Sequence, residues 1–390
     1  MCLNYFEWNA IIVKAYPGVF DREVEGQMEN GFNEVQNVKK RPAAEDLAGV
    51  TINERFRLER RLHLSKQESG GNFGVGYVAT DLHDGNQRFV KIVDFRKRMH
   101  ALDELSEILE WAKFEVLMHK ACMRMSKVVR MVAHGQLAFL EDGASEPYNF
   151  ICVVMELGEG DIKDHVDYDP RGSAYWKLWV LREISLAIVQ MERANLAHND
   201  VKPSNVIRFG SDGDRHSIKL GDVGRAVTKS GDGPFDDWIW AGDPRHMPLE
   251  TLYGYQEREW QDRSTAADAY MLGNLAAFLF AGASMTERIV SSLPPALRPG
   301  TFIGRYRDII DVIRHAWNTV LEEQIIPTFP EQSRNELSRI IRGLTDPDPT
   351  IRGEPGARKT GTLGLDRIHS QLERIALQAK VTERIASKSP

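Results

Sequence analysis

Apolar and polar residues alternate in short runs over the first part of the chain, from about residue 55 to 95, as is typical of β-strands. The run Arg-Phe-Val-Lys-Ile-Val at 88–93 is rich in β-branched and aromatic residues, and similar runs lie at 128–132 and 150–155. Between them we expect a long helix over 100–125, because several apolar residues recur at helical spacing. They are Leu102, Leu105, Ile108, Leu109 and Ala112.

The pattern changes after residue 160, where helical spacing dominates. A helix is predicted over 176–193, and the stretch 268–281 is apolar on nearly all sides, so we expect it to be buried. Two short strands, around Val206 and Ile218, are joined by a turn rich in Gly and Asp. The pattern predicts an α+β protein with a strand-rich first part and a helix-rich second part.

Length and composition narrow the class of protein. The 390 residues exceed what one hydrophobic core usually serves, which favours two lobes. With 42% apolar residues, 27% charged residues and a net charge of −6, the chain is an ordinary globular one, and we expect no nucleic-acid partner. Three cysteines form neither a disulfide framework nor a zinc motif, and no apolar run approaches the ~20 residues of a membrane span. We therefore expect a cytoplasmic protein without a membrane partner.

The most informative segment is His-Asn-Asp-Val-Lys-Pro-Ser-Asn at 198–205, which is followed by Asp-Val-Gly at 222–224. Upstream lie the glycine-rich stretch 69–74 and then Lys91. In this order the motifs resemble the eukaryotic-type Ser/Thr protein kinase superfamily over roughly 55–355, as a divergent member. The resemblance implies a two-lobed fold with a small β-rich N-lobe and a large helical C-lobe.

The resemblance also implies a reaction, the ATP-dependent transfer of the γ-phosphate to Ser or Thr hydroxyls of a protein substrate or of the enzyme itself. Asp200 would orient the acceptor hydroxyl and take its proton, and Lys202 would stabilise the transferring phosphate. Asn205 and Asp222 would offer oxygen ligands to Mg²⁺, which binds ATP through few protein ligands.

A second set of residues is expected to hold the nucleotide. By resemblance, Lys91 pairs with the α- and β-phosphates and with a helix glutamate. Glu115 fits that position best, but its separation from Lys91 is long, so Glu107 and Glu110 stay open as alternatives. Gly71 and Gly74 fit two glycines of the phosphate-covering hairpin, although such glycines alone more often mark a turn without a ligand.

The adenine is expected at the junction of the lobes, near 156–160. Met155 resembles the residue at the back of the adenine pocket, and it fits equally well as core filling. Glu156 and Gly158 would offer backbone groups to the adenine edge.

The sequence departs from the family pattern at three positions. Asn199 stands where an Arg commonly precedes the catalytic Asp, so activity is expected not to depend on a phosphorylated activation loop. Val223 replaces a Phe. Asp243 occupies the place where Ser/Thr kinases usually carry Thr, and its carboxylate is expected to weaken acceptance of an acidic substrate.

Two buried interactions are expected further along the chain. Glu250, which closes the 242–250 segment, should pair with Arg352. Asp268 matches a residue that holds the backbone of the 198–205 loop, and an ordinary helix-dipole interaction is the alternative.

The predicted domain boundaries follow from the extent of the resemblance. Residues 1–54 form an N-terminal extension, 55–158 the N-lobe, 159–355 the C-lobe and 356–390 a C-terminal helical tail. That tail is amphipathic over 365–377 and either packs on its own lobe or makes a partner or dimer contact.

Two other functions stay open. One is a pseudokinase that binds ATP as an interaction module, which the degenerate glycine loop and Val223 favour. The other is a small-molecule kinase of the aminoglycoside-phosphotransferase type, against which Lys202 and the 242–250 segment argue.

Overall fold

The computed structural model describes residues 43–62, 74–93, 102–139, 148–168, 172–212, 215–236, 238 and 242–386. These residues fall into two compact units. The N-terminal unit consists of the described residues within Phe20–Arg124 and Val129–Gly158. The C-terminal unit consists of those within Met125–Val128 and Glu159–Pro390. Strands dominate the first unit and helices the second, which confirms the predicted α+β class.

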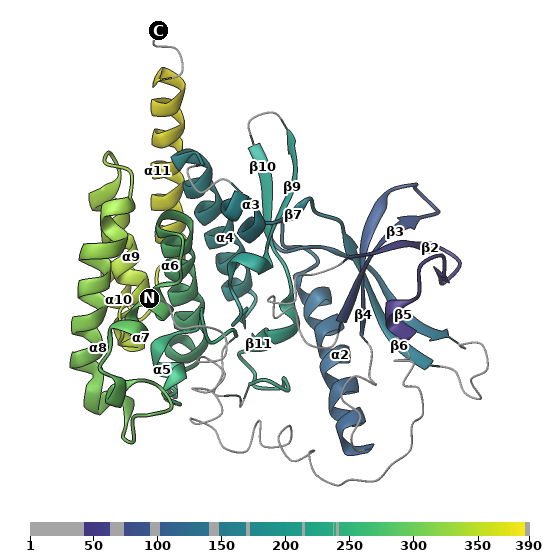
Figure 1. Ribbon diagram of the computed structural model, residues 1–390, viewed down its shortest axis with the longest axis horizontal. Helices are drawn as coiled ribbons and strands as arrows, with labels where there is room; N and C mark the ends of the chain where they lie inside the picture. Colours follow the sequence, from purple (N-terminus) through teal and green to yellow (C-terminus); the bar gives the residue numbers. More distant parts are fainter. Residues whose placement is uncertain are drawn as a thin grey trace, which may run out of the picture. The chain divides into compact units, whose positions relative to one another are not determined.

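The N-terminal unit is built on a six-stranded antiparallel sheet in the order β1-β2-β3-β4-β6-β5, with helix α2 (Leu102–Cys122) beside it (Figure 1). The strands are β1 (Thr51–Ile52), β2 (Phe56–Leu62), β3 (Gly74–Asp81), β4 (Gln87–Val93), β5 (Met131–Phe139) and β6 (Tyr148–Glu156). Alternate apolar side chains of these strands form one buried cluster, as the period of two along a strand requires. Its largest members are Phe56, Leu58, Tyr77, Ile92 and Phe150.

The chain just before the sheet is part of this core. The short helix η1 (Ala43–Glu45) brings Ala44 and Leu47 into the buried cluster. The Tyr77 hydroxyl donates to the Ala44 carbonyl (2.8 Å) and accepts from the Leu47 N–H (3.1 Å), so this buried phenol is satisfied on both sides. The structure thus packs Ala44 and Leu47 against the sheet and includes Thr51–Ile52 in it as β1, although these residues were predicted to belong to the extension. Residues 1–42 lie outside the described ranges.

The C-terminal unit carries the remaining helices and three small strand pairings (Figure 1). Strands β7 (Gly160–Asp161), β9 (Val206–Asp212) and β10 (Arg215–Leu220) form one sheet, and β8 (Leu196–Ala197) pairs with β11 (Val227–Thr228). The α-helices are α3 (Ile162–Tyr168), α4 (Ala174–Arg193), α5 (Leu249–Leu252), α6 (Ala266–Ala281), α7 (Met285–Ser292), α8 (Tyr306–Val320), α9 (Arg334–Thr345), α10 (Pro355–Arg358) and α11 (Leu365–Ala386).

Helix α6 lies at the centre of this unit, as its almost uniformly apolar sequence predicts. Gly273 permits the close approach of α9, because a Cβ atom at this position would lie 2.2 Å from Cγ2 of Thr345. Within the described residues, no single helix has the length and apolar composition of a membrane span, and one bent pair (Gln261–Ala281 and Met285–Ser292, meeting at 88°) passes on length and composition only.

The C-terminal helix packs on its own unit. Helix α11 runs along α4, and its last turns project beyond the other helices of the unit (Figure 1). Glu383 accepts hydrogen bonds from the Ser173 hydroxyl (2.6 Å) and the Tyr175 N–H (2.9 Å), and Glu373 pairs with Arg182 (2.6 Å). The buried face of α11 consists of Leu365, Ile368, Leu372, Ile375 and Ala376. Of the two roles predicted for this helix, the structure shows packing on the same chain.

A buried ion pair joins Glu250, at the end of the 242–250 segment, to Arg352. The Arg352 guanidinium, which is 0% exposed, donates to both carboxylate oxygens of Glu250 (2.6 Å each), as the sequence predicts. It also donates to the Asp346 carbonyl (2.6 Å) and lies 4.8 Å from the centre of the Tyr270 ring. Five N–H groups on a planar fork suit such multiple pairing.

Removal of one partner should therefore be costly. We expect Arg352→Met to lower the free energy of unfolding by about 3–5 kcal/mol, because it leaves the Glu250 carboxylate buried and unpaired. The matched control is Arg305→Met, whose pair with Asp308 (2.9 Å) leaves the arginine side chain 86% exposed; a change within about 1 kcal/mol is expected there. Urea unfolding followed by tryptophan fluorescence measures both variants. Equal losses of unfolding free energy would contradict the conclusion that the Glu250–Arg352 pair is buried and structurally important.

Candidate active site

In the N-terminal unit, the structure brings together Lys91 and Glu115. Lys91 lies on β4, and its Nζ donates to Oε1 of Glu115 on α2 at 2.8 Å. Glu110 is exposed on the same helix, and the side chain of Glu107 lies outside the described ones. Of the three glutamates that the sequence left open, Glu115 is therefore the one observed with Lys91. Both side chains are largely buried, so each needs the charge of the other.

Gly74 contributes space to this pair. It opens β3, and a Cβ atom at this position would lie 3.1 Å from both Cγ and Cε of Lys91. A side chain here would press on the lysine stem, so glycine lets Lys91 extend toward Glu115. Gly71, the other glycine predicted to cover the phosphates, lies outside the described residues.

The residues predicted to contact adenine lie at the end of β6 in the same unit. Met155 is buried between its cross-strand partners Phe89 and Met131. The Glu156 N–H donates to the Arg130 carbonyl (3.1 Å), and its carboxylate accepts from the Arg130 N–H (2.7 Å). The N–H of Glu156 is thus already used within the N-terminal unit. The adenine contacts of Met155, Glu156 and Gly158 stay predictions.

In the C-terminal unit, the carboxylate of Asp200 is held on both oxygens. Oδ2 pairs with Lys202 Nζ (2.9 Å) and accepts from Asn205 Nδ2 (3.0 Å), while Oδ1 accepts from the Asp243 N–H (3.1 Å). Asn205 Nδ2 also donates to the Asp200 carbonyl (2.8 Å), which closes the loop on itself. All four residues are buried. Burial lowers the pKa of Lys202, but the carboxylates of Asp200 and Asp243 outweigh that effect and raise it.

Asp268, at the start of α6, fixes the backbone of the 198–205 loop. Its two carboxylate oxygens accept the N–H groups of His198 (2.7 Å) and Asn199 (2.8 Å), as the sequence predicts. Asn199 adopts a left-handed conformation (φ 56°), which a short polar residue tolerates. Burial raises the pKa of Asp268 to about 6, against the two backbone hydrogen bonds, which lower it.

The two residues predicted to hold Mg²⁺ belong to adjoining segments. The Gly221 N–H donates to the Asn205 carbonyl (2.7 Å), and the Gly221 carbonyl lies 2.9 Å from His198 Nε2, so Asp222 directly follows a residue bound to the loop. The hydrogen bonds of the Asn205 side chain run through Nδ2, which leaves Oδ1 as its potential metal ligand. One carboxylate and one amide oxygen fit a cation that takes its other ligands from phosphate and water.

The segment that follows lies directly on Asp200. Gly242 has φ 75°, and a Cβ atom there would lie 2.5 Å from the Asn199 carbonyl oxygen and 2.7 Å from Asp200 Oδ1, so only glycine fits. The next residue, Asp243, accepts from Arg245 through Nε (3.1 Å) and Nη2 (2.8 Å). The sequence reasoning missed Arg245, because an Asp and an Arg two residues apart in a loop are usually solvated.

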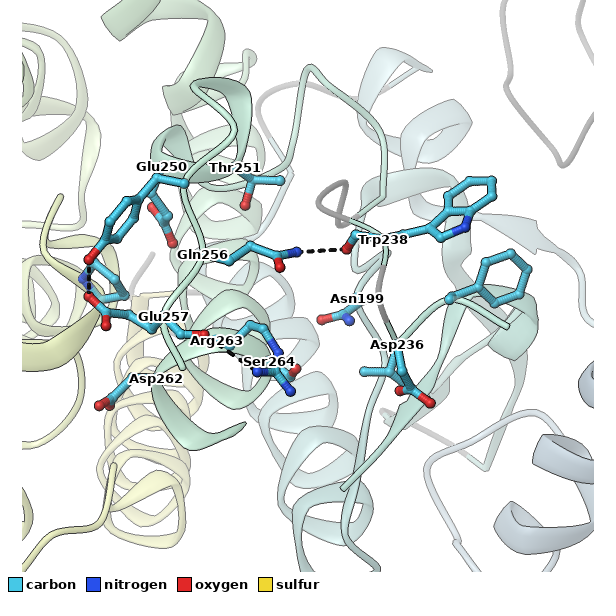
Figure 2. A pocket seen from close by; sticks show the side chains of 14 residues that line it. Asn199, Asp236, Trp238, Glu250, Thr251, Gln256, Glu257, Asp262, Arg263 and Ser264 are labelled. Carbon is cyan, nitrogen blue, oxygen red and sulfur yellow. Dashed lines mark hydrogen bonds between the residues drawn. The ribbon is translucent and has the colours of Figure 1, made fainter. Parts of the chain in front are cut away.

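A polar pocket lies beside this segment in the C-terminal unit (Figure 2). Its lining comes mainly from 227–238 and 250–264, and Asn199 points into it from the loop. Gln256 Nε2 donates to the Trp238 carbonyl (2.7 Å) across the pocket. Two acidic residues of the lining are paired, Glu257 with Arg307 (2.6 Å) and Asp262 with Arg358 (2.8 Å), so neither presents an unpaired charge to a ligand.

One more cation near the site escaped the sequence analysis. The Arg225 guanidinium lies 5.0 Å from the centres of both the Phe235 and the Trp238 rings, which contact each other edge to face at 5.3 Å. Asp236 accepts the Thr228 N–H at 3.0 Å. Cation–π contacts and a backbone hydrogen bond thus join Arg225 and Thr228 to Phe235, Asp236 and Trp238.

Comparisons with known proteins agree with this geometry. The model of the protein kinase domain family matches residues 65–353, and the chain belongs to this family. Its α+β fold, with a sheet-rich N-terminal and a helical C-terminal unit, is that of a protein kinase.

Curated relatives carry kinase names. Calcium-dependent protein kinase 8 of Arabidopsis thaliana is 26% identical over 74% of this chain and 46% of its own length. Probable serine/threonine-protein kinase zyg-1 of Caenorhabditis elegans is 28% identical over 44% of this chain and 21% of its own length. Serine/threonine-protein kinase DCLK1 of Mus musculus is 23% identical over 54% of this chain and 28% of its own length. The chain thus spans half or less of the length of these relatives.

The Lys91–Glu115 pair yields a test within one helix. We expect Glu115→Gln to lower kcat/KM for ATP by about 10- to 100-fold, since it removes the negative charge that pairs with a largely buried lysine. Glu110→Gln, on the exposed side of the same helix, should change kcat/KM by less than about twofold. Steady-state kinetics at varied ATP measure both, and a larger loss in Glu110→Gln would reject the assignment of Glu115.

Asp268 yields a second test. In Asp268→Asn, the amide nitrogen faces one of two backbone N–H groups and cannot accept from it. We expect kcat to fall by about 10- to 100-fold with KM for ATP nearly unchanged, because the loop that holds Asp200 loses a bond to a charged acceptor. Circular dichroism verifies that the variant is folded. A folded variant with the wild-type kcat would show that the loop does not need Asp268.

Proposed function

We propose that the chain transfers the γ-phosphate of ATP to Ser or Thr hydroxyls of a protein substrate or of itself. The observation that carries this proposal is the fixed carboxylate of Asp200, held by Lys202, Asn205 and the backbone of Asp243. A general base for a hydroxyl must be oriented before the acceptor arrives, and three donors on two oxygens supply that orientation. Lys202 then adds positive charge beside the acceptor.

ATP and Mg²⁺ are the proposed cofactors. Protein kinases as a family use ATP with a divalent metal, and the metal neutralises charge that develops on the phosphates. In this chain, Asn205 Oδ1 and the Asp222 carboxylate would hold the metal, and Lys91, set by Glu115, would hold phosphate oxygens. The presence of all four residues supports an active kinase over a pseudokinase that only binds ATP.

Serine and threonine are the proposed acceptors, and a reducing cytoplasm is the proposed location. The relatives named above as Ser/Thr kinases support the first statement, together with Lys202 two residues after Asp200. Two free cysteines, Cys122 and Cys152, support the second. Burial raises the pKa of both thiols to about 12, so neither is poised for thiol chemistry.

A phosphate-transfer assay tests the proposal. With γ-labelled ATP and Mg²⁺, we expect the wild type to label a generic protein or itself, at serine or threonine. Asp200→Asn and Asp222→Ala should each lower the rate by more than about 1,000-fold, because one removes the base and the other a metal ligand. The control is Asp308→Asn, an exposed carboxylate far along the C-terminal unit, which should keep the wild-type rate.

The same assay separates the other candidate functions. If the wild type transfers no label but ATP still raises its melting temperature, the chain is a nucleotide-binding module. Transfer to small molecules of a cell extract, with none to protein, would instead identify a small-molecule kinase. Removal of Mg²⁺ with EDTA should abolish transfer in either kinase.

A further inference from the structure

Two charged side chains beside Asp200, those of Asp243 and Arg245, have no assigned role in the proposed phosphate transfer. Asp243 sends its N–H to Asp200 Oδ1, and its own carboxylate is only 4% exposed. Arg245 saturates that carboxylate with three bonds, from its backbone N–H (3.0 Å), from Nε (3.1 Å) and from Nη2 (2.8 Å). The guanidinium is 28% exposed, so it forms the outer member of the pair.

The charge of Asp243 reaches the catalytic lysine. Its carboxylate is one of the groups that raise the pKa of Lys202, next to Asp200 itself. Although burial raises the pKa of the Asp243 carboxyl, Arg245 holds it well below the usual range, so this carboxylate stays ionised. Two oppositely charged pairs, Lys202 with Asp200 and Arg245 with Asp243, therefore lie next to each other, joined by the hydrogen bond from the Asp243 N–H to Asp200.

The backbone around these two pairs is fixed. The Arg245 carbonyl accepts the Ser284 hydroxyl, the His246 carbonyl accepts Asn274 Nδ2 (3.1 Å), and the Met247 carbonyl accepts the Thr286 hydroxyl (3.0 Å). Because 245–247 are tied to α6 and α7, Arg245 cannot drift away from Asp243. The pair is thus a built feature of the fold rather than a chance surface contact.

We propose that Arg245 is a positioning residue for phosphate transfer, which neutralises Asp243 and thereby keeps Lys202 directed at Asp200 and at the transferring phosphate. This inference rests on the proposed function. Without Arg245, the ionised carboxylate of Asp243 becomes a second anion that competes for the Lys202 ammonium and repels the phosphate. The expected conflict between Asp243 and acidic substrates is removed in the same way, because the carboxylate is screened by its own cation.

The test is a rescue experiment. Arg245→Met should lower kcat by about 10- to 100-fold, with KM for ATP within about threefold of the wild type. In the double variant Asp243→Asn with Arg245→Met, the stranded carboxylate is gone, and the larger part of the lost kcat should return. Recovery is incomplete because Glu287 on α7, whose charge Arg245 also opposes, remains. Arg305→Met and its double variant with Asp308→Asn serve as the matched exposed pair and should leave kcat unchanged.

The preference for one peptide acceptor over another is a second measurement. It should not change if Arg245 only stabilises the fold. The ratio of kcat/KM is measured for two serine peptides, one flanked by aspartates and one by lysines. Arg245→Met makes the site more negative and should shift this ratio about three- to tenfold toward the lysine peptide. Asp243→Asn makes it more positive and should shift the ratio the other way. A ratio that moves in neither variant, or a double variant as slow as Arg245→Met, would overturn the inference.

A failure of the proposed phosphate transfer can be distinguished from a failure of the role proposed for Arg245. If the wild type labels neither peptide nor itself, phosphate transfer is wrong, and the charge pairing is then decided by urea unfolding. Arg245→Met should lower the unfolding midpoint, and the addition of Asp243→Asn should raise it again, since the buried charge is no longer unpaired. If the midpoint of the double variant lies at or below that of Arg245→Met, the neutralising role of Arg245 is rejected as well.

Discussion

The candidate site depends on the hydrogen bonds between the Asp268 carboxylate and the backbone of the 198–205 loop. Both oxygens of this carboxylate accept backbone N–H groups, from His198 and Asn199, and Asp268 is the only charged residue of helix α6. A buried carboxylate is costly unless its lone pairs are satisfied, and here the donors are the loop that must be held. Since Asn199 is fixed in a left-handed conformation, the direction of the next residue, Asp200, is set by the backbone. The core of the C-terminal unit thereby determines the direction of the Asp200 carboxylate.

Buried charges are paired with opposite charges at four other positions of the two units. Lys91 is held by Glu115, Lys202 by Asp200, Asp243 by Arg245 and Glu250 by Arg352. In each pair at least one charge is buried, so the removal of its partner should be costly. Such pairs fix geometry more than they add stability, and fixed geometry is what a reaction needs when most of its catalysis comes from positioning and electrostatics.

The sequence predicted the parts of this arrangement that depend on residue type and spacing. The period of hydrophobic residues indicated the strands of the sheet and the buried helix α6, and the motif order indicated the family. The sequence favoured Glu115 as the partner of Lys91 but left Glu107 and Glu110 open, because the choice depends on where α2 lies against β4. The packing of Ala44 and Leu47 on Tyr77 was missed for a related reason, since it is a contact between segments about 30 residues apart with no shared motif. Arg245 was missed because its importance comes from the burial of Asp243, which spacing does not reveal.

The departures from the family pattern are linked through charge. Asn199 stands directly before Asp200, where the family commonly has an arginine, and Asp243 stands where Ser/Thr kinases usually carry Thr. The backbone N–H of Asp243 donates to Asp200. A new anion at that point would be harmful by itself, because phosphate transfer already concentrates negative charge there. It is tolerated because Arg245 follows two residues later on a backbone tied to α6 and α7. Nearby, the Arg225 guanidinium contacts both the Phe235 and the Trp238 rings. The charge of Asp243 is thus balanced by an arginine of the same segment.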